Sequence, residues 1–203
     1  MKKLGKEVSN HALKVTKVVG KDKHQQKKPY SKVEKSKSTT ASEALAGARF
    51  RYLNEKLYTM DSQAAVRYFT ENPQDFAKYH AGFAAQVASW PVNPVDIFIK
   101  RLLGKPLVGK NLSVVDMGCG EGRLGRDCGK VHRVQSFDLH SPAPHVQVGD
   151  MCNLPQVETG SADLVVFCLS LMNTNHRDAL FEAHRILKPQ GGTLWIAEVE
   201  SRL

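Results

Sequence analysis

The chain has 203 residues and a formal net charge of +9, and this length suffices for one domain with a sizeable core. All of the excess charge lies in residues 1–40, where twelve lysines face three acids, whereas residues 41–203 hold 17 basic and 17 acidic residues. No run approaches the roughly 20 apolar residues of a membrane span, and the N-terminus lacks a signal-peptide core. The sequence therefore argues against a membrane-spanning or secreted protein.

The cysteines are spaced too far apart to suggest a metal site. The four of them form no C-x-x-C pair, so the sequence predicts no zinc site, no disulfide framework and a reducing compartment. They are Cys119, Cys128, Cys152 and Cys168.

Residues 1–40 are rich in lysine, serine, threonine and glutamine and poor in large apolar groups. Such a segment cannot bury enough surface to offset its ordering entropy, so we expect a disordered Lys-rich tail. Its cations can release counterions from a nucleic acid, and residues 21–28 resemble a nuclear address. The alternative is a solvated tail without a partner.

Residues 41–109 predict a helical N-terminal cap. A first helix over 42–60 is followed by a second that Asp61 can cap. Asn72 with Pro73 marks the N-cap and first turn of a third helix. A fourth helix begins at Asn93-Pro94 and closes at Gly104 and Pro106.

The third helix carries a histidine on its apolar stripe. Phe76, His80, Phe83 and Val87 recur at helical spacing, so His80 points at packed surface. From spacing alone, the interpretation is a satisfied core histidine.

A glycine loop follows the first predicted strand. The apolar run Leu112–Val115 ends at Asp116, and glycines stand at 118, 120 and 122. A strand, a tight loop and a helix start can hold a nucleotide-like cofactor above a parallel sheet. A carboxylate at Asp116 would repel the pyrophosphate of NAD and attract a cation. The pattern Asp116-x-Gly118-x-Gly120 therefore favours S-adenosylmethionine, whose ammonium and sulfonium groups are positive.

Two further acids each end a predicted strand. Asp138 closes the strand from Val134, 18 residues after Gly120, near the spacing at which an acid binds ribose hydroxyls. Asp150 lies in the strand Val146–Met151 and could accept from an adenine amino group while Met151 packs on the ring. Taken singly, either acid is a solvated strand end or a helix cap.

The fourth strand, Ala162–Leu169, is apolar almost throughout and reads as a central strand. Cys168 within it is a small core residue that can also touch the adenine. In the following loop, Asn173 and Asn175 have the donors and acceptors to hold a base edge; alternatively they form a loop and a helix N-cap. A helix over 177–187 and a fifth strand over 193–198 complete the prediction.

Several motifs resemble one family, the ribosomal RNA-processing protein 8 methyltransferases. The resemblance covers roughly residues 45–202. It rests on the glycine loop and on five segments: Arg49-Phe50-Arg51-Tyr52-Leu53-Asn54-Glu55, Tyr79-His80-x-Gly82-Phe83, Trp90-Pro91-x-x-Pro94-Val95-Asp96, Phe167-Cys168-Leu169-Ser170-Leu171-Met172 and Ala197-Glu198-Val199.

The resemblance implies an α/β fold, a Rossmann-like class I methyltransferase with a mostly parallel sheet in residues 110–203. It implies that S-adenosylmethionine contacts the set His80, Gly118, Asp138, Asp150, Met151 and Cys168, which replaces the core interpretation of His80. Two departures stand out: Asn173 occupies a position where the family has glycine, and the sequence stops where the family continues with a helix and two strands. We therefore expect either missing C-terminal strands or a sheet completed in another way.

The leading functional hypothesis is methyl transfer to adenine N1 in large-subunit ribosomal RNA, in the nucleus and nucleolus, as the resemblance implies. Asn173 and Asn175 would orient the base, with no metal ion involved. Two alternatives remain open: a cofactor-binding ribosome-assembly or chromatin factor that transfers no methyl group, and a small-molecule methyltransferase.

Overall fold

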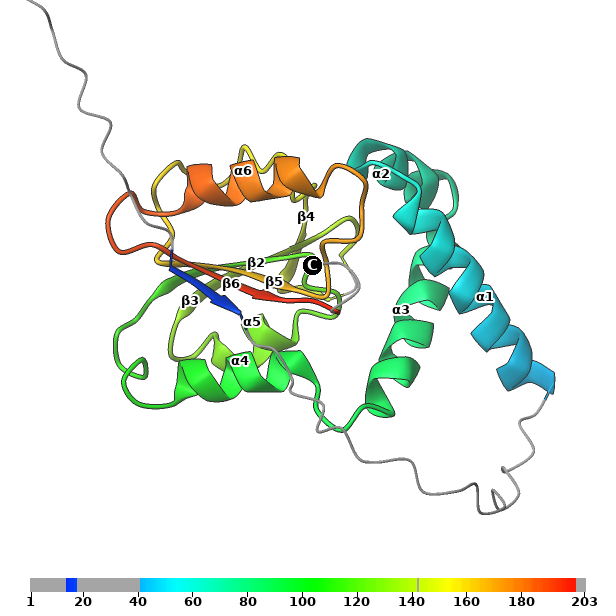
Figure 1. The fold of residues 1–203 in the computed structure, drawn as a ribbon, viewed down its shortest axis with the longest axis horizontal. Coiled ribbons are helices and arrows are strands. Elements are labelled where there is room, and N and C mark those ends of the chain that lie inside the picture. Colours follow the sequence, from blue (N-terminus) through cyan, green and yellow to red (C-terminus); the bar gives the residue numbers. More distant parts are fainter. Residues whose placement is uncertain (1–13, 18–40, 142, 200–203) are drawn as a thin grey trace, which may run out of the picture.

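The computed structural model describes residues 14–17, 41–141 and 143–199 (Figure 1). Six strands form one sheet in the order β1-β6-β5-β2-β3-β4, and each adjacent pair is parallel. The strands are β1 Lys14–Lys17, β2 Ser113–Met117, β3 Arg133–Asp138, β4 Val146–Val148, β5 Leu164–Cys168 and β6 Thr193–Ala197. The helices are α1 Ala41–Tyr58, α2 Ser62–Glu71, α3 Pro73–Ala88, α4 Pro94–Leu103, α5 Arg123–Cys128 and α6 His176–Ile186.

Helices cover both faces of this sheet and the end at which its strands terminate. Figure 1 shows α6 on one face and α4 with α5 on the other. Helices α1, α2 and α3, hereafter the helical cap, stand beyond the end of the sheet to which the strands point. The predicted α/β fold of class I methyltransferases is confirmed by this arrangement.

Strands β2 and β5 form the centre of the core because their side chains alternate between two apolar layers. Val115 of β2 and Phe167 of β5 pack with α6, whereas Val114 and Val166 pack with α4 and α5. All four side chains are fully buried. A strand buried on both faces is apolar throughout, which is why the sequence pattern identified these two strands.

The helical cap has a small core of its own and a buried carboxylate. Asp75 of α3 is 1% exposed. It accepts hydrogen bonds at 2.6 Å from both Arg49 of α1 and Tyr68 of α2. The approach of α1 to α3 needs a glycine, since a Cβ on Gly82 would lie 2.5 Å from the Cβ of Phe50. Thus one carboxylate joins all three cap helices.

Most predicted elements are present, with boundaries shifted by one to three residues. Asp61 caps α2 as expected, through a 2.7 Å hydrogen bond from Ala64 N. Asn72 precedes α3, but its amide donates to Tyr68 O instead of capping α3. The third predicted strand is shorter than expected, because β4 ends at Val148 and the chain turns at 150–153.

The expectation of a wholly disordered tail over residues 1–40 is wrong at Lys14–Lys17. These residues form β1, which pairs in parallel with β6 and occupies the edge of the sheet there. Residues 1–13 and 18–40 lie outside the described residues. Backbone hydrogen bonding at an otherwise open edge explains why a strand can form where the composition predicts none.

None of the helices in the described part of the chain is both long and apolar enough to span a bilayer.

We predict that Tyr68→Phe lowers the free energy of unfolding by about 1.5 kcal/mol, because it removes a hydrogen bond to a buried carboxylate. Arg49, and next Tyr68, lower the pKa of Asp75 to about 2 from 3.8. The ionised Asp75 carboxylate therefore stabilises the folded state fully above pH 3.8, and this stabilisation is lost as pH falls towards 2. Urea unfolding at pH 7 and at about pH 2 measures both effects.

The matched control is Tyr52→Phe on the exposed side of α1, where no hydrogen bond of the hydroxyl is recorded. Its effect should stay within about 0.5 kcal/mol. Equal losses in the two variants would contradict the role of Tyr68.

Candidate cofactor and substrate site

A cavity of about 420 Å³ lies between the helical cap and the carboxyl ends of the strands. Ligands of open α/β sheets bind at this edge, and the volume is within the usual range of ligand pockets. The sheet side of the lining is polar and includes Asp116, Gly118, Gly120, Asp138 and Ser170. The cap side is apolar and aromatic, with Leu57, Phe69, Phe76, Tyr79, Phe83 and Val87.

The glycine loop is fixed by hydrogen bonds to the end of β3. Gly118 N and Cys119 N both donate to Phe137 O, at 2.9 and 3.0 Å. Gly120 N donates to the Asp138 carboxylate at 2.7 Å. Gly118 has φ +71°, and a Cβ there would lie 2.5 Å from the Cβ of Ser170. The loop therefore needs glycine at 118 both for its backbone conformation and for its approach to the segment after β5.

Asp116 is the most strongly perturbed acid of the site. It is the penultimate residue of β2, and only 3% of its surface is exposed. Burial, and next the nearby Asp138 carboxylate, raise its pKa from 3.8 to about 7. A cationic ligand in the cavity would favour the charged form of Asp116. This carboxylate is therefore suited to a positively charged cofactor and unsuited to a phosphate.

His80 faces the glycine loop from α3. Its ring lies 4.2 Å from that of Phe76 and meets Tyr79 edge-on at 5.4 Å. A Cβ on Gly120 would lie 3.5 Å from His80 Nδ1, which places the ring directly over the loop. Burial lowers the pKa of His80, although Asp138 and Glu121 act in the opposite direction. His80 therefore lines the cavity, where an uncharged imidazole could accept or donate a hydrogen bond.

Eight of the ten site residues predicted from the sequence line this cavity. They are His80, Asp116, Gly118, Gly120, Asp138, Met151, Cys168 and Asn173. Asn173 is 6% exposed, and its amide nitrogen donates to Met60 O at 3.3 Å. For its Oδ1, no partner is recorded among the described residues, so this oxygen can accept a hydrogen bond from a ligand.

Asp150 and Asn175 do not line the cavity. Ser62 of α2 lies between them and is 2% exposed. The Ser62 hydroxyl donates to Asp150 Oδ2 at 2.7 Å, and Ser62 N donates to Asn175 Oδ1 at 2.8 Å. Asn175 Nδ2 in turn donates to the Ser62 hydroxyl at 3.2 Å. We call these three hydrogen bonds the Ser62 latch, since they tie the helical cap to two loops of the sheet.

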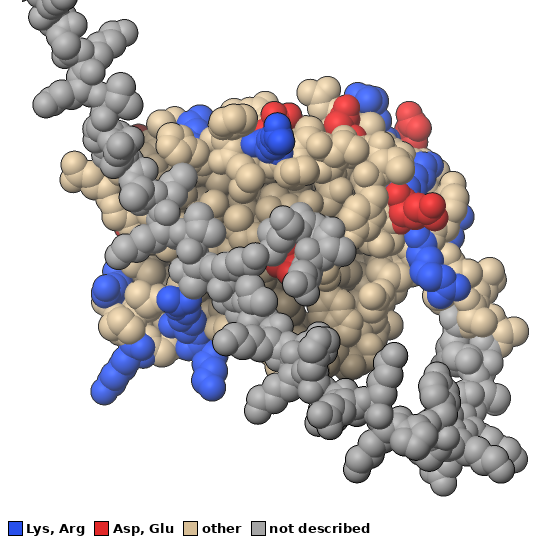
Figure 2. Space-filling model, in the orientation of Figure 1, with Lys and Arg blue, Asp and Glu red and all other residues tan. Residues whose placement is uncertain are grey.

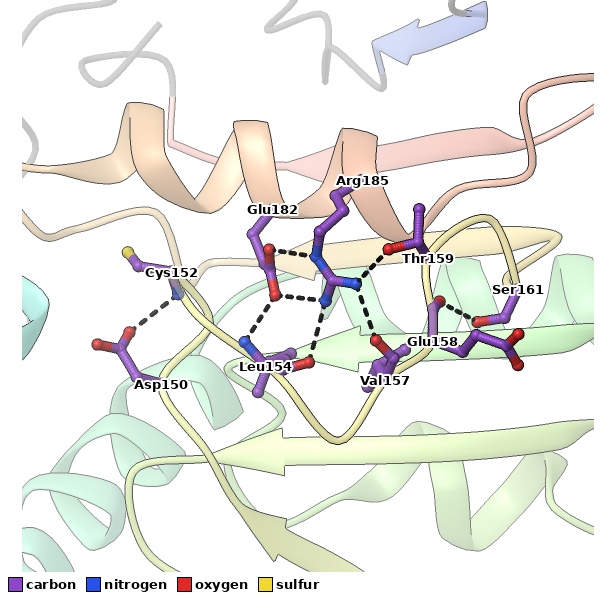
Figure 3. A network of polar contacts seen from close by, with 9 residues as sticks. All are labelled: Asp150, Cys152, Leu154, Val157, Glu158, Thr159, Ser161, Glu182 and Arg185. Atoms are coloured by element: carbon purple, nitrogen blue, oxygen red, sulfur yellow. Dashed lines mark hydrogen bonds and ion pairs between the residues drawn. The ribbon is translucent and has the colours of Figure 1, made fainter.

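Side chains of α6 hold the loop after β4 in place (Figure 3). Arg185 donates to Leu154 O at 3.0 Å and to Val157 O at 2.9 Å, and it pairs with Glu182. Glu182 accepts from Leu154 N at 2.6 Å. Asp150 accepts from Cys152 N at 2.9 Å at the start of this loop. The segment carrying Asp150 and Met151 is therefore fixed at both ends.

The sequence did not indicate several residues that shape the site. Ser62 has no distinguishing pattern, because its role depends on contacts with residues about 90 and 110 positions away. Leu169 adopts φ +60°, a conformation that few non-glycine residues take and that often marks functional loops. The Tyr79 hydroxyl, which lies 3.4 Å from Met172 Sδ, connects the cap to the same loop. Among these features of the helical cap, only the apolar stripe of α3 was visible in the sequence, and it predicted a packed face and not a cavity.

No group of three metal-ligating side chains occurs within residues 14–17, 41–141 and 143–199.

The family model described as "Hypothetical methyltransferase" matches residues 36–203. The chain belongs to this methyltransferase family. The predicted cofactor, S-adenosylmethionine, agrees with this membership, and the cavity fits it: buried Asp116 suits a cation, and Asp138 can accept from a diol.

Named relatives confirm the resemblance to ribosomal RNA-processing protein 8. The methyltransferase is 47% identical over 165 residues to "25S rRNA (adenine(645)-N(1))-methyltransferase" of Schizosaccharomyces pombe, covering 78% of this chain and 51% of that protein. It is 52% identical over 158 residues to "Ribosomal RNA-processing protein 8" of Mus musculus, covering 78% of this chain and 33% of that protein. The chain thus spans from one third to about half the length of these curated relatives.

We predict that cofactor affinity rises with pH between about 6 and 8 as Asp116 ionises, by up to about tenfold per pH unit below its pKa. Binding at pH 6 should release a proton, because the cation favours the charged carboxylate. Titration calorimetry in two buffers of different ionisation enthalpy measures both quantities. Asp116→Asn should bind weakly with little pH dependence.

The same carboxylate predicts a change in stability without ligand. Its pKa is raised in the folded state, so the folded protein binds more protons than the unfolded chain between pH 3.8 and about 7. Stability should therefore fall as pH rises through this range, and Asp116→Asn should lessen the fall. A profile of melting temperature against pH that is unchanged in the variant would contradict this.

We predict that Ser62→Ala weakens cofactor binding by about tenfold and lowers the free energy of unfolding by about 1–3 kcal/mol. The change leaves Asp150 Oδ2 without its donor and Asn175 Nδ2 without one of its acceptors. The control is Ser89→Ala, an exposed serine of the same cap that bonds only Gln86 O. Loss of stability with unchanged cofactor affinity would mean that the Ser62 latch does not serve the site.

Proposed function

We propose that the chain is the catalytic part of an S-adenosylmethionine-dependent methyltransferase that forms N1-methyladenosine in large-subunit ribosomal RNA. The observation that carries the proposal is the cavity itself, in which Asp116 and Asp138, from the carboxyl ends of two neighbouring strands, face an aromatic cap. The names of the relatives refer to ribosomal RNA and its processing, which supports the substrate and action in ribosome biogenesis. The nucleus and nucleolus are the location that we propose for this action.

The cofactor would lie along the sheet side of the cavity. When bound, S-adenosylmethionine supplies a methyl group on a positively charged sulfur. Asp138 would accept from the ribose hydroxyls, and His80 with Gly118 would hold the methionine end. Met151 and Cys168 would pack on the adenine. Asp150 would act through the loop that it anchors, since its Oδ2 is engaged by Ser62.

The substrate base would enter from the cap side of the cavity. Adenine N1 has a free lone pair, so attack in line with the sulfur–methyl bond needs no strong general base. The N1–carbon bond forms as the carbon–sulfur bond breaks, and the electron pair remains on sulfur. Asn173 Oδ1 is free to accept from the adenine amino group beside N1. Asn175 would contribute indirectly, by holding Ser62.

Catalysis would then come mainly from positioning. A near-attack geometry can contribute roughly 7–11 kcal/mol to the rate. The helical cap, fixed by the Ser62 latch and by the contact between Tyr79 and Met172, would exclude water and restrict the base to one orientation. Because N1 faces its pairing partner in duplex RNA, the target must be unpaired or extruded.

The first test is calorimetric titration with S-adenosylmethionine and, separately, with NAD. We predict that only S-adenosylmethionine binds, and that Asp138→Asn weakens it at least tenfold, because two hydrogen bonds to a charged acceptor are impaired. Asn at 138 can still accept from Gly120 N, so the loop is retained. The control is Asp127→Ala, an acid of α5 that pairs only with neighbouring Arg126. Binding of NAD would refute the cofactor assignment.

A single-turnover assay with unmodified large-subunit ribosomal RNA then separates an enzyme from a binding factor. Methyl transfer at adenine N1, reduced at least tenfold in Asn173→Ala with unchanged cofactor affinity, supports the proposal. Cofactor binding without any transfer would favour an assembly factor instead.

A further inference from the structure

Six basic side chains stand at the end of the sheet opposite the cavity. Lys100 and Arg101 lie in the last turn of α4, Lys105 and Lys110 follow in the next loop, Lys130 lies after α5, and Arg133 begins β3. All six are exposed. We call them the amino-edge basic face. Figure 2 shows Lys and Arg side chains gathered at the lower left, where Figure 1 places the C-terminal end of α4.

The three segments that carry these residues are held together. Buried His132 bridges them, since its Nδ1 accepts from Leu112 N at 3.2 Å and its Nε2 lies 3.0 Å from Leu102 O. Arg133 N donates to Leu112 O at 2.9 Å. The end of α4, the 104–112 loop and the start of β3 therefore form one continuous surface.

The segments that carry these six side chains contain no acid. Residues 97–115 and 128–137 hold six Lys and Arg and no Asp or Glu. Within the described residues, none of the six forms an ion pair, whereas Arg49, Arg123, Arg126 and Arg185 all do. Asp163, which accepts from Ser113 N at the same end of the sheet, pairs with Lys188 at 2.6 Å and also interacts electrostatically with Arg133. One acid thus lies beside six cations and Lys188, and the face keeps a net positive charge although residues 41–203 are neutral overall.

The opposite end of the sheet, where the cavity lies, is negatively charged. Asp116, Glu121 and Asp138 line the cavity, and Asp96 lies nearby. Among the described residues, Arg123 is the one Lys or Arg in the lining, and it is paired with Asp96 at 2.6 Å. Phosphates beside the target base would be repelled there. Affinity for a polyanion must therefore come from another surface.

We propose that the amino-edge basic face binds the phosphate backbone of RNA flanking the target nucleotide. The inference rests on the proposed RNA substrate. Helix α4 connects the two sites, because Val95 in its first turn lines the cavity and Arg101 lies in its last turn. Its ten residues span about 15 Å. At roughly 3.4 Å per phosphate in a duplex, about five nucleotides cover that distance.

An anionic lipid surface is the competing partner, since Leu103 and Val108 are also exposed in this region. RNA is favoured because the chain's family relatives carry names that refer to ribosomal RNA. Vesicles containing phosphatidylserine therefore serve as the second probe.

The test compares two triple variants of the full chain. One carries Lys105→Ala, Lys110→Ala and Lys130→Ala; Arg101 is kept because its guanidinium lies 4.8 Å from the ring of Trp195. The control carries Arg51→Ala, Arg67→Ala and Arg177→Ala, three exposed cations elsewhere for which no ion pair is recorded in the described residues. Both remove three positive charges. Binding of a labelled 30-nucleotide RNA is measured from low to moderate salt, together with binding of S-adenosylmethionine.

For the first variant we expect RNA affinity to fall at least tenfold and the slope of log K against log salt to shrink by about 2, since each lost single-strand phosphate contact contributes about 0.7. The control should change affinity by less than about threefold. Cofactor binding should be unchanged in both. Adenosine should bind both variants equally, because the nucleoside has no phosphate for the face to contact.

Equal losses in the two triple variants would overturn the proposal, because net charge alone would then explain the binding. Vesicle binding that falls in the first variant while RNA binding does not would also overturn it. This test is independent of methyl transfer. A fall in RNA affinity supports RNA binding by the basic face even if ribosomal RNA is not methylated. Methylation that the first variant leaves unchanged would refute the basic-face proposal alone and would leave the proposed function standing.

Discussion

The site depends on the parallel pairing of the strands. Since β2, β3 and β5 run in the same direction, their last residues meet at one edge whatever their distance along the chain. Asp116, Asp138 and Cys168 are therefore neighbours by necessity. The hydrogen bond from Gly120 N to Asp138 then fixes the loop between them. An acid buried at this edge cannot be fully solvated, and the raised pKa of Asp116 is the direct result.

The sequence predicted what depends on local pattern. Apolar strands, glycines at every second position and acids at strand ends gave the fold class and most of the cavity's polar side, because each of these features is visible within a few residues. His80 shows the limit of this approach: its helical spacing indicates a packed surface, and only the tertiary structure shows that this surface includes a cavity. The resemblance to a family supplied the same assignment by another route.

Residues that act across long sequence separations were not predictable. Ser62 contacts Asp150 and Asn175, and nothing near Ser62 in the sequence indicates that pairing. As a consequence, two residues expected inside the site support it from outside. The edge strand β1 was missed for a related reason, because its formation depends on the free edge of β6 and not on its own composition. Such features follow from the assembled sheet.

The separation of charge along α4 also has a consequence for encounters in solution. Within residues 41–199, acids line the cavity and cations gather at the far end of the sheet, so this part of the molecule has a separation of charge along the strands. In the field of a polyanion it will turn its amino edge forward, so the cavity faces away during first contact. A target base must then come round the molecule to enter from the cap side of the cavity. The fold thus sets an order of events, in which RNA first contacts the basic face and the target base enters the cavity afterwards.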